Sequence, residues 1–369
     1  MRDRNRTSTL AKWRRRLAVG LAAGGVSVLA GCAKLKADES ALNPAGPQAE
    51  RIHSLWHLFY IVCVVVYVLV MLTLLIAMIR RRSGNAAEGS DSVIQPESVK
   101  EKRLWTVVSA CIGITTITLF VLLFSDFATG RSMYDLSHSP NPLRIKVVGH
   151  QWWWEVIYID WPEQFGERGA YNQVTTANEI HIPAGGDQPV TVEFQLDSAD
   201  VIHSFWVPNL HGKKDLIPGH ATLTWLRADQ PGMYWGECAE YCGFQHAQMR
   251  LLVIAEPPDK FHQWLEGQRK PAEDPKDPQA IRGKQVFTQG ACLMCHSIQG
   301  TEARGRVGPD LTHLQSRQII GAGAAQNVPG HLAGWVSNAQ SIKPGVKMPP
   351  VNLSPQDLRA LLEYLETLK

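Results

Sequence analysis

The sequence has little excess charge and few cysteines, and each shortage excludes a class of protein. Its formal net charge is only +3 over 369 residues, which argues against a general nucleic-acid-binding protein. Its seven cysteines are too few, and too specifically spaced, for a scaffold held by disulfides. Charged residues make up 19% and hydrophobic residues 45%, a balance that excludes a disordered chain. The length allows two or three folded domains.

Residues 1–31 are typical of a signal peptide. They hold seven basic residues and one acidic residue, and an apolar run, Leu17–Leu29, that is too short to span a bilayer. The run leads into Leu-Ala-Gly-Cys32, which resembles a bacterial lipoprotein cleavage site. The resemblance implies cleavage before Cys32 and a lipid on its sulfur. The alternative is an ordinary signal peptide with an incidental cysteine.

Two uncharged apolar runs follow within residues 32–125. Leu58–Ile79 and Leu104–Phe124 hold 22 and 21 residues, and a helix of either length spans a bilayer. Basic residues border the loop between them: Arg80, Arg81, Arg82, Lys100, Lys102 and Arg103. The positive-inside rule therefore places this loop in the cytoplasm. We expect a multi-pass protein of the bacterial cytoplasmic (inner) membrane, in contact with the lipid bilayer, with its soluble domains on the periplasmic or external side.

The soluble part divides into two domains of different class. Residues 126–256 hold short strand-like runs separated by Gly and Pro turns, a pattern that predicts an all-β sandwich or barrel. The expected strands are Arg144–Val148, Val156–Ile159, Glu179–Ile182, Val190–Leu196, Thr222–Leu226 and Leu251–Ala255. Residues 257–280 are rich in proline and charge, which indicates a helix near Phe261–Arg269 and then a stiff linker. Residues 281–369 are predicted to be all-α, with a last helix near Pro355–Leu368.

The strongest local signal is Cys238-Ala-Glu-Tyr-Cys242-Gly-Phe-Gln-His246-Ala-Gln-Met249. Two thiols, an imidazole and a thioether fall within twelve residues, and these soft ligands together suit copper in electron transfer. A second histidine is needed from elsewhere, and His203 is the candidate. A zinc site or a disulfide between the cysteines is the alternative. Zinc rarely recruits methionine, and a disulfide leaves the other donors unexplained.

From the first apolar run to about residue 255 the chain resembles subunit II of the haem–copper cytochrome c oxidases. The resemblance implies a cupredoxin-like domain that carries the binuclear CuA centre, with two copper ions. In that family both thiolates bridge the coppers, so Cys238 and Cys242 would be the bridging residues. The resemblance implies one further pair of ligands for each copper: His203 with Met249, and His246 with the backbone carbonyl of Glu240.

Two further segments match the same family. Gly-His-Gln-Trp152-Trp-Trp resembles its aromatic segment, in which the first tryptophan passes electrons into CuA, so Trp152 would have that role. The alternative is an aromatic cluster in the domain core, and both can hold. The resemblance also implies that the Glu240 side chain helps to bind a magnesium ion shared with subunit I. Residues 214–219, Lys-Asp-Leu-Ile-Pro-Gly, resemble the loop at that interface, although His220 stands where many relatives carry arginine.

Cys292-Leu-Met-Cys295-His296 is a c-type haem attachment sequence. The two thiols would bind one haem covalently, and His296 would be its proximal iron ligand. An axial methionine would raise the reduction potential of the iron. Met348, in a proline-rich loop, is the candidate for this other axial position. His313 and His331 are the alternatives, and we interpret both as surface histidines.

The two soluble domains carry opposite charge. Residues 104–282 hold 13 basic and 21 acidic residues, and residues 283–369 hold 8 basic and 5 acidic residues. Opposite charges steer soluble electron carriers to their acceptors. The hypothesis is a haem domain that docks loosely over Trp152 on the acidic face, at a high effective concentration set by the linker. The alternative is that the charges are merely solvated.

The chain is therefore identified as a member of the oxidase subunit II family with a fused cytochrome c domain, as in caa3-type oxidases. The resemblance implies a subunit of a proton-translocating oxidoreductase that takes electrons from a donor to haem c, then CuA, then haem a. Subunit I, with haem a, haem a3 and CuB, would reduce oxygen and pump protons, with subunit III as a further partner. The donor would be a soluble or membrane cytochrome c or the bc1 complex. No general acid, base or nucleophile is required of this chain.

Two other functions remain open from the sequence. One is a membrane-bound haem and copper electron carrier without an oxidase partner. The other is the CuA subunit of a nitric oxide reductase. The interface segment around Asp215 and Glu240 favours the oxidase.

Overall fold

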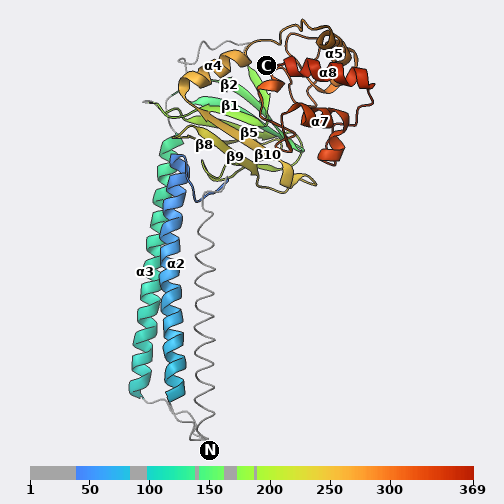
Figure 1. The fold of residues 1–369 in the computed structure, drawn as a ribbon. Coiled ribbons are helices and arrows are strands. Elements are labelled where there is room, and N and C mark those ends of the chain that lie inside the picture. The colour runs from blue at the N-terminus through green and yellow to red at the C-terminus, as the bar shows by residue number, and fades with distance from the viewer. Residues whose placement is uncertain (1–38, 84–97, 138–140, 162–172, 187–188) are drawn as a thin grey trace, which may run out of the picture.

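The computed structural model describes residues 39–83, 98–137, 141–161, 173–186 and 189–369. The chain forms a pair of long helices, a β domain above them and a helical domain beside the β sheets (Figure 1). The signal peptide predicted for residues 1–31 and the lipidation predicted at Cys32 lie outside the described residues.

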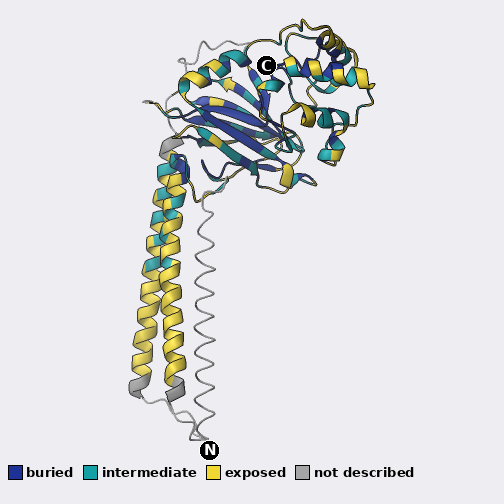
Figure 2. Cartoon of the chain, viewed as in Figure 1, coloured by how far each residue is buried: buried dark blue, intermediate teal, exposed yellow. Residues whose placement is uncertain are grey.

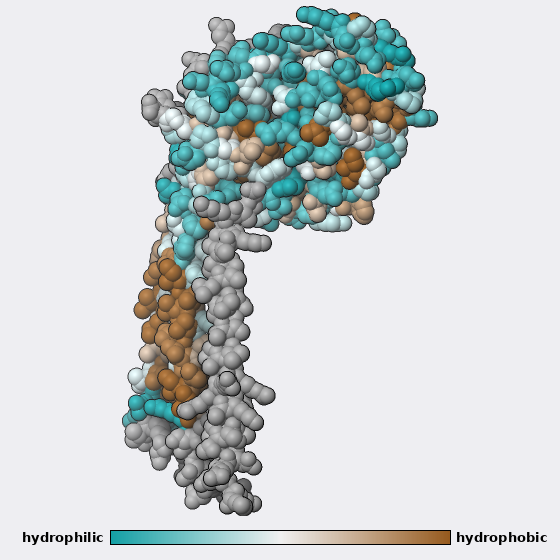
Figure 3. All heavy atoms as spheres, in the orientation of Figure 1, coloured by the Kyte–Doolittle hydropathy of each residue, from teal (hydrophilic) through white to brown (hydrophobic). Residues whose placement is uncertain are grey.

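Helices α2 (Pro47–Ser83) and α3 (Ser98–Ser137) pack side by side and stand away from the β domain (Figure 1). Both are long and apolar enough to cross a membrane, over Pro47–Arg80 and Glu101–Tyr134. Their apolar side chains face outward, and hydrophobic atoms cover the middle of the visible face of the pair, with hydrophilic atoms at both ends (Figures 2 and 3). A surface of this kind is stable only in lipid. Both helices extend beyond the apolar runs, because the flanking polar residues continue the helical hydrogen bonds.

The β domain consists of two five-stranded sheets packed face to face. One has the order β3-β2-β1-β5-β8 and the other β4-β10-β9-β6-β7. The strands of the first sheet are β1 (Leu143–His150), β2 (Trp153–Asp160), β3 (Val174–Ala177), β5 (Val192–Ser198) and β8 (Thr222–Leu226). Those of the second are β4 (Glu179–Pro183), β6 (His203–Trp206), β7 (Lys214–Leu216), β9 (Gly232–Cys238) and β10 (Arg250–Glu256).

Alternating side chains of the two sheets form one apolar core. Along β5, every second residue is buried, as expected for a strand with one face in the core. The core includes Cys238, Cys242 and Met249, so three of the predicted copper ligands lie inside it. Helix α4 (Pro258–Gln268) closes one end of the same core with Phe261 and Leu265.

Four strands of the β domain were not predicted from the sequence: β3, β6, β7 and β9. The first three have only three or four residues each, too few to show a period-two pattern. In β9 the pattern is broken by Gly236, whose Cβ position would lie 2.6 Å from the carbonyl oxygen of Trp206. Glycine is needed there because two backbones approach closely, and it weakens the local strand signal.

The C-terminal domain is mainly helical, as predicted. Its helices are α5 (Pro278–Gln289), α6 (Cys292–Cys295), α7 (Pro329–Ile342) and α8 (Pro355–Thr367). Short segments complete it: η4 (Leu314–Ser316), β11 (Ile319–Ile320) and β12 (Ala325–Gln326). Ser354 caps α8 by accepting a hydrogen bond from the Asp357 amide, which confirms the predicted helix start. Helices α5 and α8 cross where Gly283 lies against Ala360.

Candidate metal and haem centres

The residues of the predicted copper motif come together at one end of the second sheet. Strand β9 ends at Cys238, and strand β10 begins at Arg250, so the loop between these strands holds the rest of the motif. His203 starts β6, which pairs with β9. This pairing brings a histidine 35 residues earlier in the chain next to the first cysteine.

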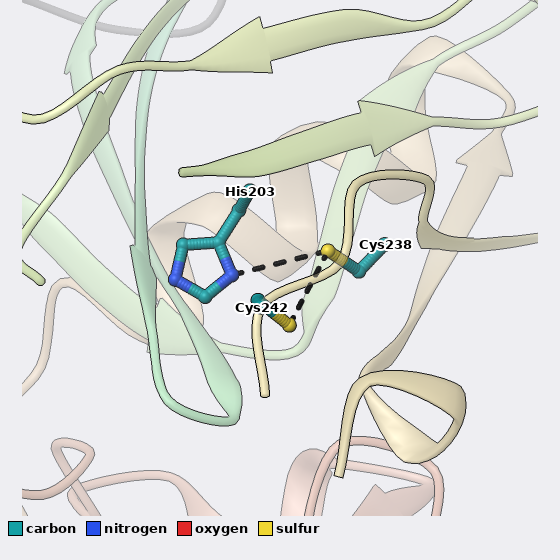
Figure 4. A group of neighbouring side chains, drawn as sticks. All are labelled: His203, Cys238 and Cys242. Carbon is teal, nitrogen blue, oxygen red and sulfur yellow. Dashed lines mark hydrogen bonds between the residues drawn. The ribbon is translucent and has the colours of Figure 1, made fainter. Parts of the chain in front are cut away.

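Four of these side chains form a tight cluster (Figure 4 labels three of them). The sulfurs of Cys238 and Cys242 lie 3.7 Å apart. Nδ1 of His203 lies 3.9 Å from the Cys238 sulfur, and Nδ1 of His246 lies 3.6 Å from the Cys242 sulfur. His203, Cys238 and Cys242 form a group that could hold a metal ion among the residues that the structure describes. The geometry therefore joins both thiols to both imidazoles.

Two further donors reach the same two sulfurs. The thioether sulfur of Met249 lies 3.8 Å from the Cys242 sulfur, and it is fully buried. The backbone carbonyl of Glu240 lies 3.2 Å from the Cys238 sulfur, while the Glu240 side chain is exposed. The cluster thus offers two buried thiols, two imidazoles, a buried thioether and a carbonyl. The soft sulfur donors together with the imidazoles fit copper, and the methionine argues against zinc.

The electrostatics of the cluster favour a thiolate at Cys238. The neighbouring Cys242 thiol and the His203 imidazole lower the pKa of Cys238, although burial acts against them. The same interaction raises the pKa of Cys242, because a second negative charge so close to the first is unfavourable. Burial alone would lower the pKa of His203, but its hydrogen bonds with Cys238 and Asp200 raise it.

Asp200 orients His203, and the sequence analysis missed it. Nε2 of His203 lies 2.9 Å from a carboxylate oxygen of Asp200, which leaves Nδ1 directed at the thiols. Burial would raise the pKa of Asp200, but the hydrogen bonds from His203 and from two backbone amides lower it. A carboxylate behind a ligand histidine is the usual way to fix its ring and tautomer. The only signal in the sequence is an aspartate three residues before the histidine, which is too common to be specific.

Trp152 lies against the copper loop. Its indole N–H donates to the carbonyl of Cys242 at 3.1 Å, and the Gln151 side chain donates to the same oxygen at 2.8 Å. Gly149, three residues earlier, lies under the His203 ring, where a Cβ would be 2.7 Å from the ring carbon. The aromatic segment is therefore hydrogen-bonded to the backbone of the copper loop, in addition to its packing in the domain core.

In the C-terminal domain the attachment sequence forms the short helix α6. Cys292 and Cys295 are its first and last residues, both half-buried, and His296 ends it. Nδ1 of His296 lies 2.8 Å from the carbonyl of Pro309, so its Nε2 remains available for an iron ion. Burial lowers the pKa of His296, which favours the neutral imidazole that a metal needs. Gly308 gives the ring room, because a Cβ there would lie 2.6 Å from it. These residues fit a covalently bound haem.

The three candidates for the other axial position differ in placement. Met348 is half-buried in the loop after α7, and the side-chain amide of Gln340 donates to the backbone carbonyl of Met348 at 2.8 Å. His331 is exposed, as expected. The interpretation of His313 as a surface residue was wrong. It is buried, and its two ring nitrogens lie 2.6 and 3.0 Å from backbone carbonyls, because it joins the C-terminus to the segment after α4.

Two family models match the chain, one in each soluble domain. Residues 143–256 match the cytochrome c oxidase subunit II periplasmic domain, and residues 280–369 match the cytochrome c family. Cytochrome c oxidase subunit 2 of Alkalihalophilus pseudofirmus is 35% identical over 89% of this chain and 91% of its own. The chain belongs to the cytochrome c oxidase subunit 2 family.

A second relative and one solved structure are also similar to this chain. Cytochrome c oxidase subunit 2 of Bacillus subtilis is 28% identical over 93% of this chain and 94% of its own. The crystal structure of the periplasmic domain of oxidase subunit II (CoxB) of Bradyrhizobium japonicum is 28% identical. It covers 36% of this chain and 96% of its own, with a TM-score of 0.30.

Membership of the subunit 2 family establishes the general role of the chain. It is a subunit of cytochrome c oxidase, an oxidoreductase complex, and it associates with other oxidase subunits. Its cupredoxin-like domain implies CuA copper, and its cytochrome c domain implies haem c. The fused cytochrome c domain fits the caa3 type. The two apolar helices anchor the protein in a membrane, with a periplasmic domain.

Proposed function

We propose that this subunit accepts electrons at its haem domain and delivers them through CuA to subunit I of the oxidase. The bound groups would supply the electron carriers, haem c first and then two copper ions, with haem a and the oxygen-reducing, proton-pumping site in subunit I. The observation that carries the proposal is the convergence of six donor groups in one buried cluster beside Trp152. A rigid, buried ligand set needs little movement on reduction, which suits rapid electron transfer.

The proposed pairing of ligands is the one that the resemblance to oxidase subunit II implies. Cys238 and Cys242 would bridge the two coppers, and each sulfur lies beside one imidazole and one further donor. His203 and Met249 would complete one copper. His246 and the carbonyl of Glu240 would complete the other. The exposed Glu240 side chain remains free for a magnesium ion shared with subunit I.

The haem would be held by a second set of residues. Cys292 and Cys295 would form the covalent bonds, and His296 and Met348 would be the axial ligands of the iron. The haem domain places Gly345 against Trp152, where a Cβ would lie 3.6 Å from the indole ring. Gln245 of the copper loop donates to the carbonyl of the preceding Pro344 at 2.6 Å. This contact supports Trp152 as the residue at which electrons pass from the haem domain.

Electrons would leave on the side of the cluster that faces the membrane helices. A cavity of about 660 Å³ opens there, lined by residues of the copper site and of the start of α2, among them Cys238, His246, Ala49 and Ile52. A site this close to both the copper ligands and the membrane suits a loop of subunit I. We further propose a location in the bacterial cytoplasmic membrane, a lipid on Cys32, and a cytochrome c or the bc1 complex as the donor.

The test is metal analysis and electron paramagnetic resonance on the full-length protein. We expect two coppers and one iron per chain, with the hyperfine pattern of a delocalised copper pair. His246→Ala should lose the copper signal and keep the covalent haem. His331→Ala, which removes an exposed histidine outside the cluster, should keep both. Iron without copper in a folded protein that was reduced before reconstitution would refute the proposal.

Co-purification tests the partner. We expect the chain to purify with a large subunit that contains haem a. A complex without haem a would favour the nitric oxide reductase, and a chain that purifies alone would favour the separate electron carrier.

A further inference from the structure

A fully buried lysine lies between the two soluble domains. Lys343 follows the last residue of α7 and has no exposed surface. Its amine donates to the carbonyl of Trp152 at 2.8 Å, of Gln248 at 2.7 Å and of Gly321 at 2.8 Å. The first two carbonyls belong to the copper domain and the third belongs to the haem domain. A single side chain therefore connects the backbone of Trp152, the copper loop and the haem domain.

The Lys343 amine can make all three of these hydrogen bonds only in one relative position of the two domains. A protonated amine has three N–H donors, and the three carbonyls use all of them. Burial lowers the pKa of Lys343 to about 7, and the three carbonyls offset the cost of burying its charged form. A shift of either domain would remove acceptors from the amine. The contact is therefore specific in geometry.

A second set of buried contacts supports the same position. One carboxylate oxygen of Glu179 accepts hydrogen bonds from the backbone amides of Gln318 and Ile319, at 2.6 and 2.7 Å. The Arg250 amide donates to the carbonyl of Ala322 at 3.0 Å. Ile319 also packs with Leu252 and Ile254 of β10, with Trp235 beside them. The Arg250 bond joins backbone to backbone, and the Glu179 bonds join a buried side chain to backbone amides. Loose electrostatic docking would not produce such contacts.

Ion pairs at the surface contribute little to the stability of the contact between the two domains. Among the described residues, the ion pair of Lys347 with Asp200, at 3.3 Å, is the one that crosses between the domains. The Lys347 side chain is 58% exposed, so salt screens the pair and it adds little stability. The loose docking expected from the opposite charges of the domains is therefore replaced by buried hydrogen bonds.

We propose that Lys343 is a positioning residue that holds the haem domain in one docked position against Trp152. Electron transfer between the two domains then needs no diffusional search, and its rate is independent of ionic strength. The loop after Lys343 carries Gly345, which lies against the indole of Trp152. The lysine thus fixes the backbone on both sides of the contact between Gly345 and Trp152.

The first test is hydrogen exchange on the full-length protein, compared between the natural chain, Lys343→Met and Lys347→Met. Both variants replace a lysine of the same loop by methionine, but the first removes the buried donor and the second a surface ion pair. We expect the backbone amides of Arg250 and Ile319 to exchange at least about tenfold faster in Lys343→Met, because three buried carbonyls lose their donor. Amides inside α8 should keep their protection, and Lys347→Met should match the natural chain.

The second test is the rate of reduction of copper after photoreduction of the haem. Salt is varied from about 0.01 to 1 M, which shortens the screening length from about 30 to about 3 Å. We expect no salt dependence in the natural chain or in Lys347→Met, and a slower, salt-dependent rate in Lys343→Met. This readout depends on the proposed function, whereas hydrogen exchange does not, so the two can fail separately.

Exchange of the Arg250 and Ile319 amides that is unchanged in Lys343→Met would overturn the proposal. If Lys343→Met also loses protection inside α8, the domain itself is disturbed, and Lys343→Gln decides the question. Glutamine keeps a neutral donor in the same place. We expect it to loosen the boundary amides while α8 stays protected, and unchanged boundary exchange in that variant would overturn the proposal.

Discussion

The crossing of α5 and α8 allows a quantitative prediction at Gly283. A Cβ at this position would lie 1.9 Å from the carbonyl oxygen of Ala360 and 2.7 Å from the Cβ of Tyr364. Both obstacles are fixed parts of α8 rather than the ends of flexible side chains. Gly283→Ala therefore forces the two helices apart by about 1 Å, since carbon and oxygen normally stay more than about 3 Å apart.

The cost should lie at the upper end of the range for overpacking. Overfilling a core typically lowers the free energy of unfolding by about 1–3 kcal/mol. Because the backbone of α8 cannot rotate away from the added methyl group, we expect a loss of about 3 kcal/mol. For a domain of this size about 1 kcal/mol shifts the melting temperature by roughly 4–8 °C. Gly283→Ala should therefore lower the melting temperature of the haem domain by roughly 12–24 °C.

The measurement is thermal unfolding of the full-length protein, followed by circular dichroism in the Soret band of the covalent haem. Gly330→Ala is the matched control, because Gly330 lies in α7 of the same domain with no atom near its Cβ position. That change should leave the melting temperature unchanged or raise it slightly, since alanine favours a helix by up to about 1 kcal/mol. If Gly283→Ala melts like Gly330→Ala, the reasoning about the helix crossing is refuted.

Three further predictions concern the haem site, the domain boundary and a helix cap. Gly308→Ala should displace the His296 ring, so the haem stays covalently bound while its absorption spectrum shows altered axial ligation. Burial raises the pKa of Glu179 to about 7, so its contribution to stability is fully present below about pH 4.5 and is lost as the pH rises through 7. The melting temperature of the natural chain should therefore fall between pH 6 and 8 by more than that of Glu179→Gln, and equal falls would contradict this. Ser354→Ala removes the cap on the Asp357 amide and should cost the haem domain about 1 kcal/mol, measured by the same melting experiment.

Local signals in the sequence were enough for several parts of the protein. The membrane helices follow from uncharged runs whose length matches a bilayer. The start of α8 follows from Ser354 and the proline after it, because a cap depends on neighbouring residues alone. The attachment motif likewise follows from its spacing, since both cysteines and His296 lie within five residues.

Other parts could not be predicted because they depend on contacts between distant segments. His313 looks like any polar loop residue, and only the folded chain shows that carbonyls of two remote segments surround it. Asp200 becomes the partner of His203 through the turn before β6. Lys343 stands between Ile342 and Pro344 at the end of a helix, where lysine is normally exposed, yet it is among the most deeply buried side chains.

The sequence by itself determined the chemistry of this protein: thiols, imidazoles and thioethers at spacings that suit copper and haem, on a chain with two apolar runs. Such motifs can be recognised in a sequence because the ligands that a metal needs are few and chemically distinctive. Tertiary structure alone decided how the two centres are placed relative to each other. That placement rests on backbone carbonyls and amides, which every residue possesses and which only folding brings to Lys343 and Glu179.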